Sequence, residues 1–96
     1  MIDLDKKSLD LVRAILKKHL PNTEVKAFGS RVTGKAKPYS DLDLVIMGNQ
    51  ALPIETLNEI KFEFSNSDLP ILIDIIDWPA ISDSFREKIK ADCEVL

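Results

Sequence analysis

One short run constrains the fold of this chain more than any other segment. Ile71 to Ile76 reads Ile-Leu-Ile-Asp-Ile-Ile. So many β-branched and apolar residues in succession are typical of a strand that is covered on both faces of a sheet, so we expect an interior strand here. Its one polar residue, Asp74, would then bring a carboxylate into an apolar layer, which costs several kcal/mol unless a cation or hydrogen bonds offset the charge.

Two other segments predict strands. Glu24 to Phe28 alternates polar and apolar residues and runs into Gly29, which is typical of a strand that ends in a turn. Asp41 to Met47 also alternates, with Leu42, Leu44 and Ile46 on one face and Asp41, Asp43 and Val45 on the other. Because side chains alternate along a strand, this segment has one apolar face and one largely acidic face.

Three helices are predicted from apolar residues at helical spacing. The first covers residues 5–20, the second covers residues 53–65, and the last ends near residue 93. Ser84 and Glu87 fit a capping box for the last helix. Its apolar face has four members: Ile81, Phe85, Ile89 and Cys93. The predicted order is helix, strand, strand, helix, strand, helix.

Length and composition favour one small domain over residues 1–96. Hydrophobic residues make up 45% of the chain and charged residues 30%, as in ordinary globular proteins. No apolar run approaches the ~20 residues that span a bilayer, and the acidic start MIDLDKKSLD is unlike a secretory signal. We therefore expect a cytoplasmic protein with no membrane partner.

Two residue counts exclude other classes of protein. The single cysteine, Cys93, can form neither an intrachain disulfide nor a multi-cysteine zinc site. Thirteen Lys and Arg residues against sixteen Asp and Glu give a net charge of −3. The chain therefore lacks the positive field that binds nucleic acid. His19 has no partner at metal-ligand spacing, so we expect a structural role for it.

The segment GSRVTGKAKPYSDLDLVI, which begins at Gly29, admits two interpretations. Gly29, Gly34 and Lys35 match the spacing of a phosphate-binding P-loop. However, a P-loop needs a Ser or Thr hydroxyl to bind magnesium at the position of Ala36. It also needs a helix that begins at the lysine, and Pro38, three residues after Lys35, disfavours a helix there. The P-loop interpretation is therefore disfavoured.

Asp41 and Asp43 support the second interpretation, which is a metal site. Residues two apart on a strand point the same way, with Cα atoms about 6.5 to 7 Å apart, so two carboxylates can converge on one ion. Carboxylate oxygens suit Mg²⁺ or Mn²⁺. Asp74 completes a cluster of three if its strand lies beside the second strand. Asp77 is the alternative third carboxylate, but it faces the other way and more simply caps the strand end or is solvated.

Gly29 and Ser30 fit the same site. A glycine after a strand lets a polyphosphate approach the backbone, and a serine hydroxyl with the amides of a helix start can hold phosphate oxygens. Arg31 and Lys35 either neutralise phosphate charge or are solvated surface residues.

These residues make the chain resemble the minimal nucleotidyltransferases of the DNA polymerase β-like superfamily. The family pattern is Gly-Ser, a spacer, Asp-x-Asp and a later third carboxylate, matched here by Gly29-Ser30, Asp41-Leu42-Asp43 and Asp74. The resemblance covers nearly the whole chain and implies an α/β (α+β) fold in which helices flank a small mixed sheet. It also implies that ATP binds with two Mg²⁺ ions. The phosphates would lie at Gly29, Ser30 and Arg31, and the metals at Asp41, Asp43 and Asp74.

The same resemblance implies a protein partner. Stand-alone domains of this kind resemble the antitoxin half of a toxin–antitoxin pair, whose toxin is an all-helical HEPN-type ribonuclease. In that family the antitoxin transfers AMP from ATP to a tyrosine of the toxin, so we expect AMPylation of a protein hydroxyl within a homo- or hetero-oligomer. The alternative is a catalytically silent module that binds and blocks a partner. The three carboxylates favour the enzyme, because a pure binder needs no buried Asp74.

Overall fold

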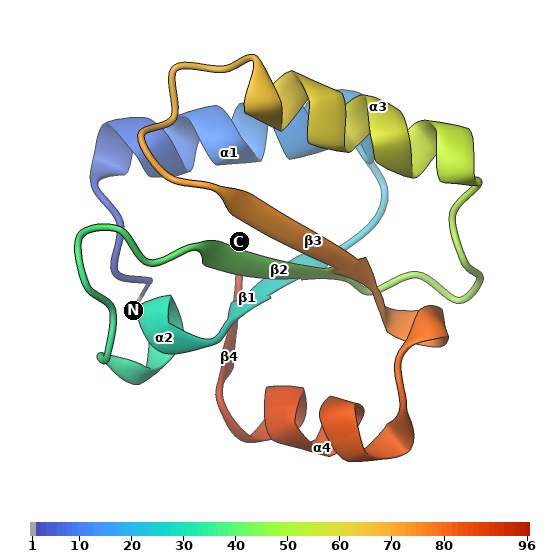
Figure 1. Ribbon diagram of the computed structural model, residues 1–96. Coiled ribbons are helices and arrows are strands. Elements are labelled where there is room, and N and C mark those ends of the chain that lie inside the picture. Colours follow the sequence, from blue (N-terminus) through green and yellow to red (C-terminus); the bar gives the residue numbers. More distant parts are fainter. Residues whose placement is uncertain (1) are drawn as a thin grey trace.

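The computed structural model describes residues 2–96, and its centre is a four-stranded mixed sheet (Figure 1). The strands are β1 (Val25–Phe28), β2 (Leu42–Ile46), β3 (Ile73–Asp77) and β4 (Cys93–Val95), in the order β3-β2-β1-β4. β1 is antiparallel to β2 and β4, whereas β2 and β3 are parallel. This mixed sheet confirms the predicted fold class. Met1, the first residue of the predicted domain, lies outside the described residues.

Helices cover the sheet from both sides (Figure 1). α1 (Lys6–His19) and α3 (Ile54–Ser65) lie side by side over one face, and α4 (Asp83–Ala91) lies on the other side. α2 (Ser30–Thr33) is a single turn after β1, and a 3₁₀ turn, η1 (Trp78–Ala80), follows β3. Within residues 2–96 no helix is long and apolar enough to cross a membrane.

The main core lies between the sheet and the pair of helices α1 and α3. Leu42, Leu44 and Ile46 of β2 are fully buried, as the alternation in the sequence predicts. They belong to one cluster with apolar residues of the helices and the other strands: Val12, Ile15, Leu16, Ala27, Ile60, Phe64 and Ile75. Because this apolar face of β2 is held in the core, Asp43 is directed to the opposite face of the sheet.

His19 joins the two helices of this layer. Its Nε2 lies 2.7 Å from Oε1 of Glu63 on α3, and Nζ of Lys18 lies 3.0 Å from the same oxygen. The contact with His19, followed by that with Lys18, lowers the pKa of the Glu63 carboxyl. These contacts between helices agree with a structural role for His19.

β3 is an edge strand, so the prediction of an interior strand for residues 71–76 is wrong. Its only strand neighbour within residues 2–96 is β2. Ile75 is buried in the core, but Leu72 is 73% exposed and Asp74 is exposed. The expected burial of the Asp74 carboxylate in an apolar layer is therefore also wrong. The apolar run reflects burial on one face, and strand order depends on pairing between distant segments, which composition does not encode.

The last helix is shorter than predicted. α4 ends before Cys93, and Cys93 belongs to β4, where it pairs with Phe28 of β1. The cap of α4 is Ser82, whose hydroxyl accepts a hydrogen bond from the Phe85 amide at 3.2 Å, and not Ser84. The open edge of β1 provides backbone hydrogen bonds for β4, a segment too short to show a strand pattern of its own.

Candidate active site

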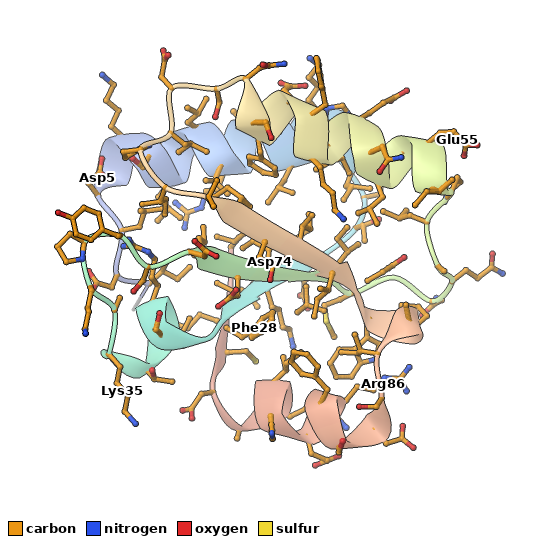
Figure 2. All side chains as sticks on the ribbon, in the orientation of Figure 1. Asp5, Phe28, Lys35, Glu55, Asp74 and Arg86 are labelled. Carbon is orange, nitrogen blue, oxygen red and sulfur yellow. The ribbon has the colours of Figure 1, made fainter. Side chains whose placement is uncertain are left out.

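Two of the predicted carboxylates meet across neighbouring strands. Asp43 on β2 and Asp74 on β3 are register partners in the parallel pair. Register partners place their side chains on the same face, and this face is opposite the one that packs against α1 and α3. Figure 2 shows Asp74 in the space between the layer of α1 and α3 and the helix α4. The condition that the third strand lies beside the second is therefore met.

Asp41 interacts with this pair from the end of the strand. Asp41 is exposed just before β2, whereas Asp43 is half-buried. Burial, followed by the negative charges of Asp74 and then of Asp41, raises the pKa of the Asp43 carboxyl to about 6. Asp74 and Asp41 therefore each lie close enough to Asp43 to repel its charge, and a cation beside Asp43 would relieve that repulsion.

Gly29 brings the turn after β1 against Asp43. Its φ of +81° is one that residues with a side chain rarely adopt, and a Cβ atom at this position would overlap Oδ2 of Asp43. Phe28, the preceding residue, is the register partner of Asp43 in the antiparallel pair of β1 and β2. The Gly29-Ser30 turn and the carboxylates, which are separated in the sequence, are therefore neighbours in space.

The residues of this site fit a hard divalent cation. Three carboxylates offer the all-oxygen ligands that Mg²⁺ prefers. In their present side-chain positions, no three His, Cys, Asp or Glu residues within 2–96 are gathered closely enough to surround an ion. The register of β2 and β3 already fixes the Cα positions of Asp43 and Asp74, so side-chain rotation is the adjustment by which these two would share an ion.

The P-loop interpretation fails in the structure as well. The helix after β1 begins at Ser30, and Gly34 ends it in the left-handed conformation with φ +82°. Lys35 therefore follows a one-turn helix instead of opening a longer one. Figure 2 shows Lys35 beyond α2, pointing away from Asp74.

Arg31 is predicted among the phosphate-binding residues, and in the structure its guanidinium is held by backbone carbonyls. The residue is only 6% exposed. Its Nε donates to the Ser40 carbonyl at 2.9 Å, and its Nη1 donates to the Asp3 carbonyl at 2.7 Å. Its Nη2 donates to the carbonyls of Lys37 and Pro38 at 3.4 and 3.3 Å. Arg31 thus holds the loop before β2 against the N-terminal segment, and it is not a solvated surface residue.

Asp77 occupies a buried position on the opposite face from Asp74. It is 6% exposed, and its Oδ2 accepts a hydrogen bond from the Leu52 amide at 2.6 Å. Its Oδ1 has no hydrogen-bond partner among the described residues. Asp77 therefore joins the end of β3 to the segment before α3. It is not solvated, although solvation was one of the two roles expected for it. Because Asp77 faces away from Asp43, Asp74 is better placed than Asp77 as the third carboxylate.

An aromatic surface beside the carboxylates was not predicted. The rings of Phe28 and Phe85 meet edge to face, with centroids 5.8 Å apart. Phe28 is the register partner of Asp43, and Phe85 is 39% exposed, so α4 adds an apolar side to the acidic face. The alternation of residues 24–28 places Phe28 on this face, but only tertiary packing decides that α4 brings Phe85 to it.

The protein has a nucleotidyltransferase fold. This class is defined by the mixed sheet with flanking helices and by the Asp-x-Asp strand beside a Gly-Ser turn. The chain belongs to the nucleotidyltransferase domain family, which it matches over residues 9–96. The protein is therefore a nucleotidyltransferase, as the sequence predicts.

Comparison with individual proteins gives closer relatives. The chain is 45% identical over 89 residues to a probable protein adenylyltransferase MntA of Haemophilus influenzae, which covers 93% of this chain and 78% of that protein. A crystal structure described as a toxin-antitoxin with AMP-PNP matches with a TM-score of 0.76 and 18% identity, over 96% of this chain and 72% of that one. Another, described as a mutant of the toxin-antitoxin MntA-HpeT, matches with a TM-score of 0.74 and 19% identity, over 92% and 70%. At these identities the structures show a shared fold.

Proposed function

We propose that this protein transfers AMP from ATP to a tyrosine hydroxyl of a partner toxin and thereby neutralises the toxin. The proposal of AMP and of a protein acceptor is supported by the likeness to a probable protein adenylyltransferase. The proposal of a toxin partner is supported by the structural neighbours described as toxin-antitoxin complexes. The observation that carries the chemistry is the Asp43 and Asp74 register pair beside the Gly29 turn.

Asp41, Asp43 and Asp74 are proposed to hold Mg²⁺. When bound, Mg²⁺ neutralises phosphate charge and lowers the pKa of the acceptor hydroxyl. The raised pKa of Asp43 supports this assignment, because burial and two neighbouring negative charges disfavour its charged form, and a bound cation would offset that cost. Gly29 and Ser30 are proposed to bind the triphosphate, since glycine admits a phosphate to the backbone and the serine hydroxyl can donate to its oxygens.

The transfer is a displacement at the α-phosphorus of ATP. The acceptor oxygen forms a bond to this phosphorus, the bond from the phosphorus to the oxygen shared with the β-phosphate breaks, and pyrophosphate leaves with that electron pair. The hydroxyl proton passes to Asp74. This carboxylate is exposed on the edge strand and is therefore accessible to an incoming acceptor.

The proposed partner is an all-helical HEPN-type toxin, and the proposal of this type rests on the family resemblance. One relative is described together with a second component, HpeT, in a toxin-antitoxin complex. The present protein would form a hetero-oligomer with its toxin, and one tyrosine of that toxin would receive AMP.

The test is transfer of label from ATP that is labelled in its α-phosphate, with Mg²⁺, to the product of the adjacent gene co-expressed with this protein. We expect wild type to label a tyrosine of that product, and the double variant Asp41→Asn plus Asp43→Asn to label none. The matched control is Asp10→Asn plus Asp83→Asn, which removes two exposed carboxylates from α1 and α4. Label transfer that persists in the first double variant contradicts the assigned roles, and a wild type that labels no tyrosine contradicts the acceptor.

A further inference from the structure

Within residues 2–96, the backbone groups on the outer edge of β3 have no strand partner, and this edge lies directly beside the candidate active site. β3 is the last strand of the sheet on this side. The Leu72 carbonyl accepts a hydrogen bond from the Leu42 amide at 3.0 Å, so the backbone groups of Leu72 point toward β2. Because these groups alternate along a strand, the amides and carbonyls of Ile73 and Ile75 point away from β2. They form a short row of donors and acceptors along the edge.

A groove runs along the same edge. Its volume is about 410 Å³, and it is walled by the carboxyl-terminal half of α3, by the segment 69–72 and by β3 as far as Ile75. Asp74 is one of its lining residues. The groove therefore reaches one carboxylate of the candidate site, and a chain that lies in it passes beside Asp74.

The strand β3 itself carries little of the protection that sheet edges usually have. Natural proteins guard such edges with lysine, proline, bulges or a covering segment. β3 itself has no lysine or proline, and Leu72 before it is 73% exposed, although Lys61 of α3 and Pro70 line the groove beside it. The only charge near the middle of the strand is Asp74, which the site itself uses. An edge strand with free backbone groups and an exposed apolar neighbour is suited to strand addition by another chain.

We propose that this edge of β3 receives an extended loop or terminal segment of the acceptor protein, outside its helices, as an added strand, with the acceptor tyrosine placed opposite Asp74. The proposal rests on the proposed function and specifies how its acceptor is bound. The chemistry that recognises the acceptor is backbone pairing with Ile73 and Ile75, together with apolar contact to Leu72.

Strand spacing explains why a long side chain is needed. Neighbouring strands lie about 4.8 Å apart, so an added strand lies about two spacings from β2, which carries Asp43. The acceptor oxygen must reach the space between Asp74 and Asp43, across the width of β3. A tyrosine side chain can span such a gap, whereas serine and threonine are too short. The geometry therefore selects tyrosine among the hydroxyl side chains.

A second copy of this chain is a poorer occupant of the edge. Pairing two β3 edges would bring both acidic sites to a shared boundary, with Asp74 of each copy close to the other. Like charges on adjacent strands are destabilising. It would also cover the groove that an acceptor needs.

The test compares two acceptors for labelled AMP. One is a short peptide with a central tyrosine flanked by threonine and valine, which can form a strand; the other is N-acetyltyrosine amide, which cannot. We expect Ile73→Pro to lower kcat/KM for the peptide at least about tenfold, the equivalent of one lost hydrogen bond, and to leave the rate with the amide within about twofold. Proline is tolerated at the first residue of an edge strand when its amide faces outward. Ile73→Ala measures the part of the loss that comes from the side chain.

A second pair of variants covers the case in which Ile73→Pro does not fold. Leu72→Lys places a charge on the exposed apolar side of the edge and should also lower kcat/KM for the peptide at least about tenfold. Its matched control, Phe62→Lys, changes a similarly exposed apolar residue of α3 that does not line the groove.

The outcomes separate this inference from the proposed function. If wild type uses the peptide no better than the amide, or if Leu72→Lys and Phe62→Lys behave alike, strand addition is overturned and the transferase assignment stands. If wild type labels neither acceptor but labels the product of the adjacent gene, only strand addition is overturned; if it labels none of the three, both proposals fail. An independent readout is amide hydrogen exchange, in which the peptide should slow exchange at Ile73 and Ile75. Unchanged exchange at saturating peptide overturns the inference.

Discussion

Asp43 is the residue at which burial and charge oppose each other most clearly. It is half-buried, and its pKa is raised from 3.8 to about 6, first by burial and then by Asp74 and Asp41. The folded protein therefore holds the Asp43 proton more tightly than the unfolded chain does. The stability that this protonation contributes is fully present below pH 3.8 and is lost as the pH rises through about 6.

This sign predicts a stabilising substitution. In metal-free buffer at about pH 7.5, Asp43→Asn should raise the free energy of unfolding by about 1 kcal/mol, after allowance for solvent screening of a partly exposed group. Most of the difference from wild type should disappear at about pH 4.5. Urea unfolding at the two pH values measures it, with Asp83→Asn as the control. Equal stability of Asp43→Asn and wild type at both pH values would contradict the raised pKa of Asp43.

Substitutions of Arg31 test whether this residue stabilises the fold or binds phosphate. Its guanidinium donates to four backbone carbonyls, so Arg31→Ala should lower the free energy of unfolding by about 2 kcal/mol. Arg31→Lys should recover less than half of this loss, because an ammonium lacks the planar fork. Lys35→Ala, an exposed neighbour, should change little. If Arg31→Ala is as stable as wild type but binds ATP weakly, Arg31 is a phosphate ligand after all.

At the scale of the element, the sequence predicts strongly patterned segments well and weakly patterned ones poorly. The helices predicted over residues 5–20 and 53–65 are found as α1 and α3, and the alternation of residues 41–47 correctly predicts the buried face of β2. β4 could not be predicted, because its three residues form a strand only through the edge of β1. The cap of α4 was misplaced because Ser82 and Ser84 both precede an apolar helical face, and only the backbone shows which hydroxyl reaches an amide.

The two serines provide a matched pair for a stability test. Ser82→Ala removes the side chain that accepts from the Phe85 amide and should cost about 1 kcal/mol. Ser84→Ala, two residues away in an exposed position, should cost much less. Thermal unfolding of the two variants measures the difference. Equal losses would mean that α4 does not begin where the structure places it.

At the scale of the whole molecule, strand order decides both what the sequence predicted and what it missed. The motif Gly-Ser, Asp-x-Asp and a later Asp was sufficient to anticipate the fold, and the parallel pairing of β2 and β3 brings Asp43 and Asp74 together. The same order leaves β3 at the edge, which no local pattern indicated. Asp74 is consequently exposed, and the edge beside it is open to an acceptor.

We also expect protons and a metal ion to compete for the carboxylate of Asp43. Because the pKa of Asp43 is about 6, affinity for Mn²⁺ should fall about fourfold between about pH 7.5 and 5.5 from this group alone. Electron paramagnetic resonance of free Mn²⁺ measures the binding. Asp43→Asn should bind more weakly at both values and should show a smaller pH dependence. A wild-type affinity that is independent of pH would contradict a role for Asp43 as ligand.

The most direct test of the central claim is a crystal structure with Mn²⁺ and a non-hydrolysable ATP analogue. Anomalous scattering locates the metal without reference to the protein atoms. We predict that the metal is coordinated by oxygens of both Asp43 and Asp74, with the triphosphate at the Gly29-Ser30 turn. A metal bound elsewhere, or bound without Asp74, would contradict the account.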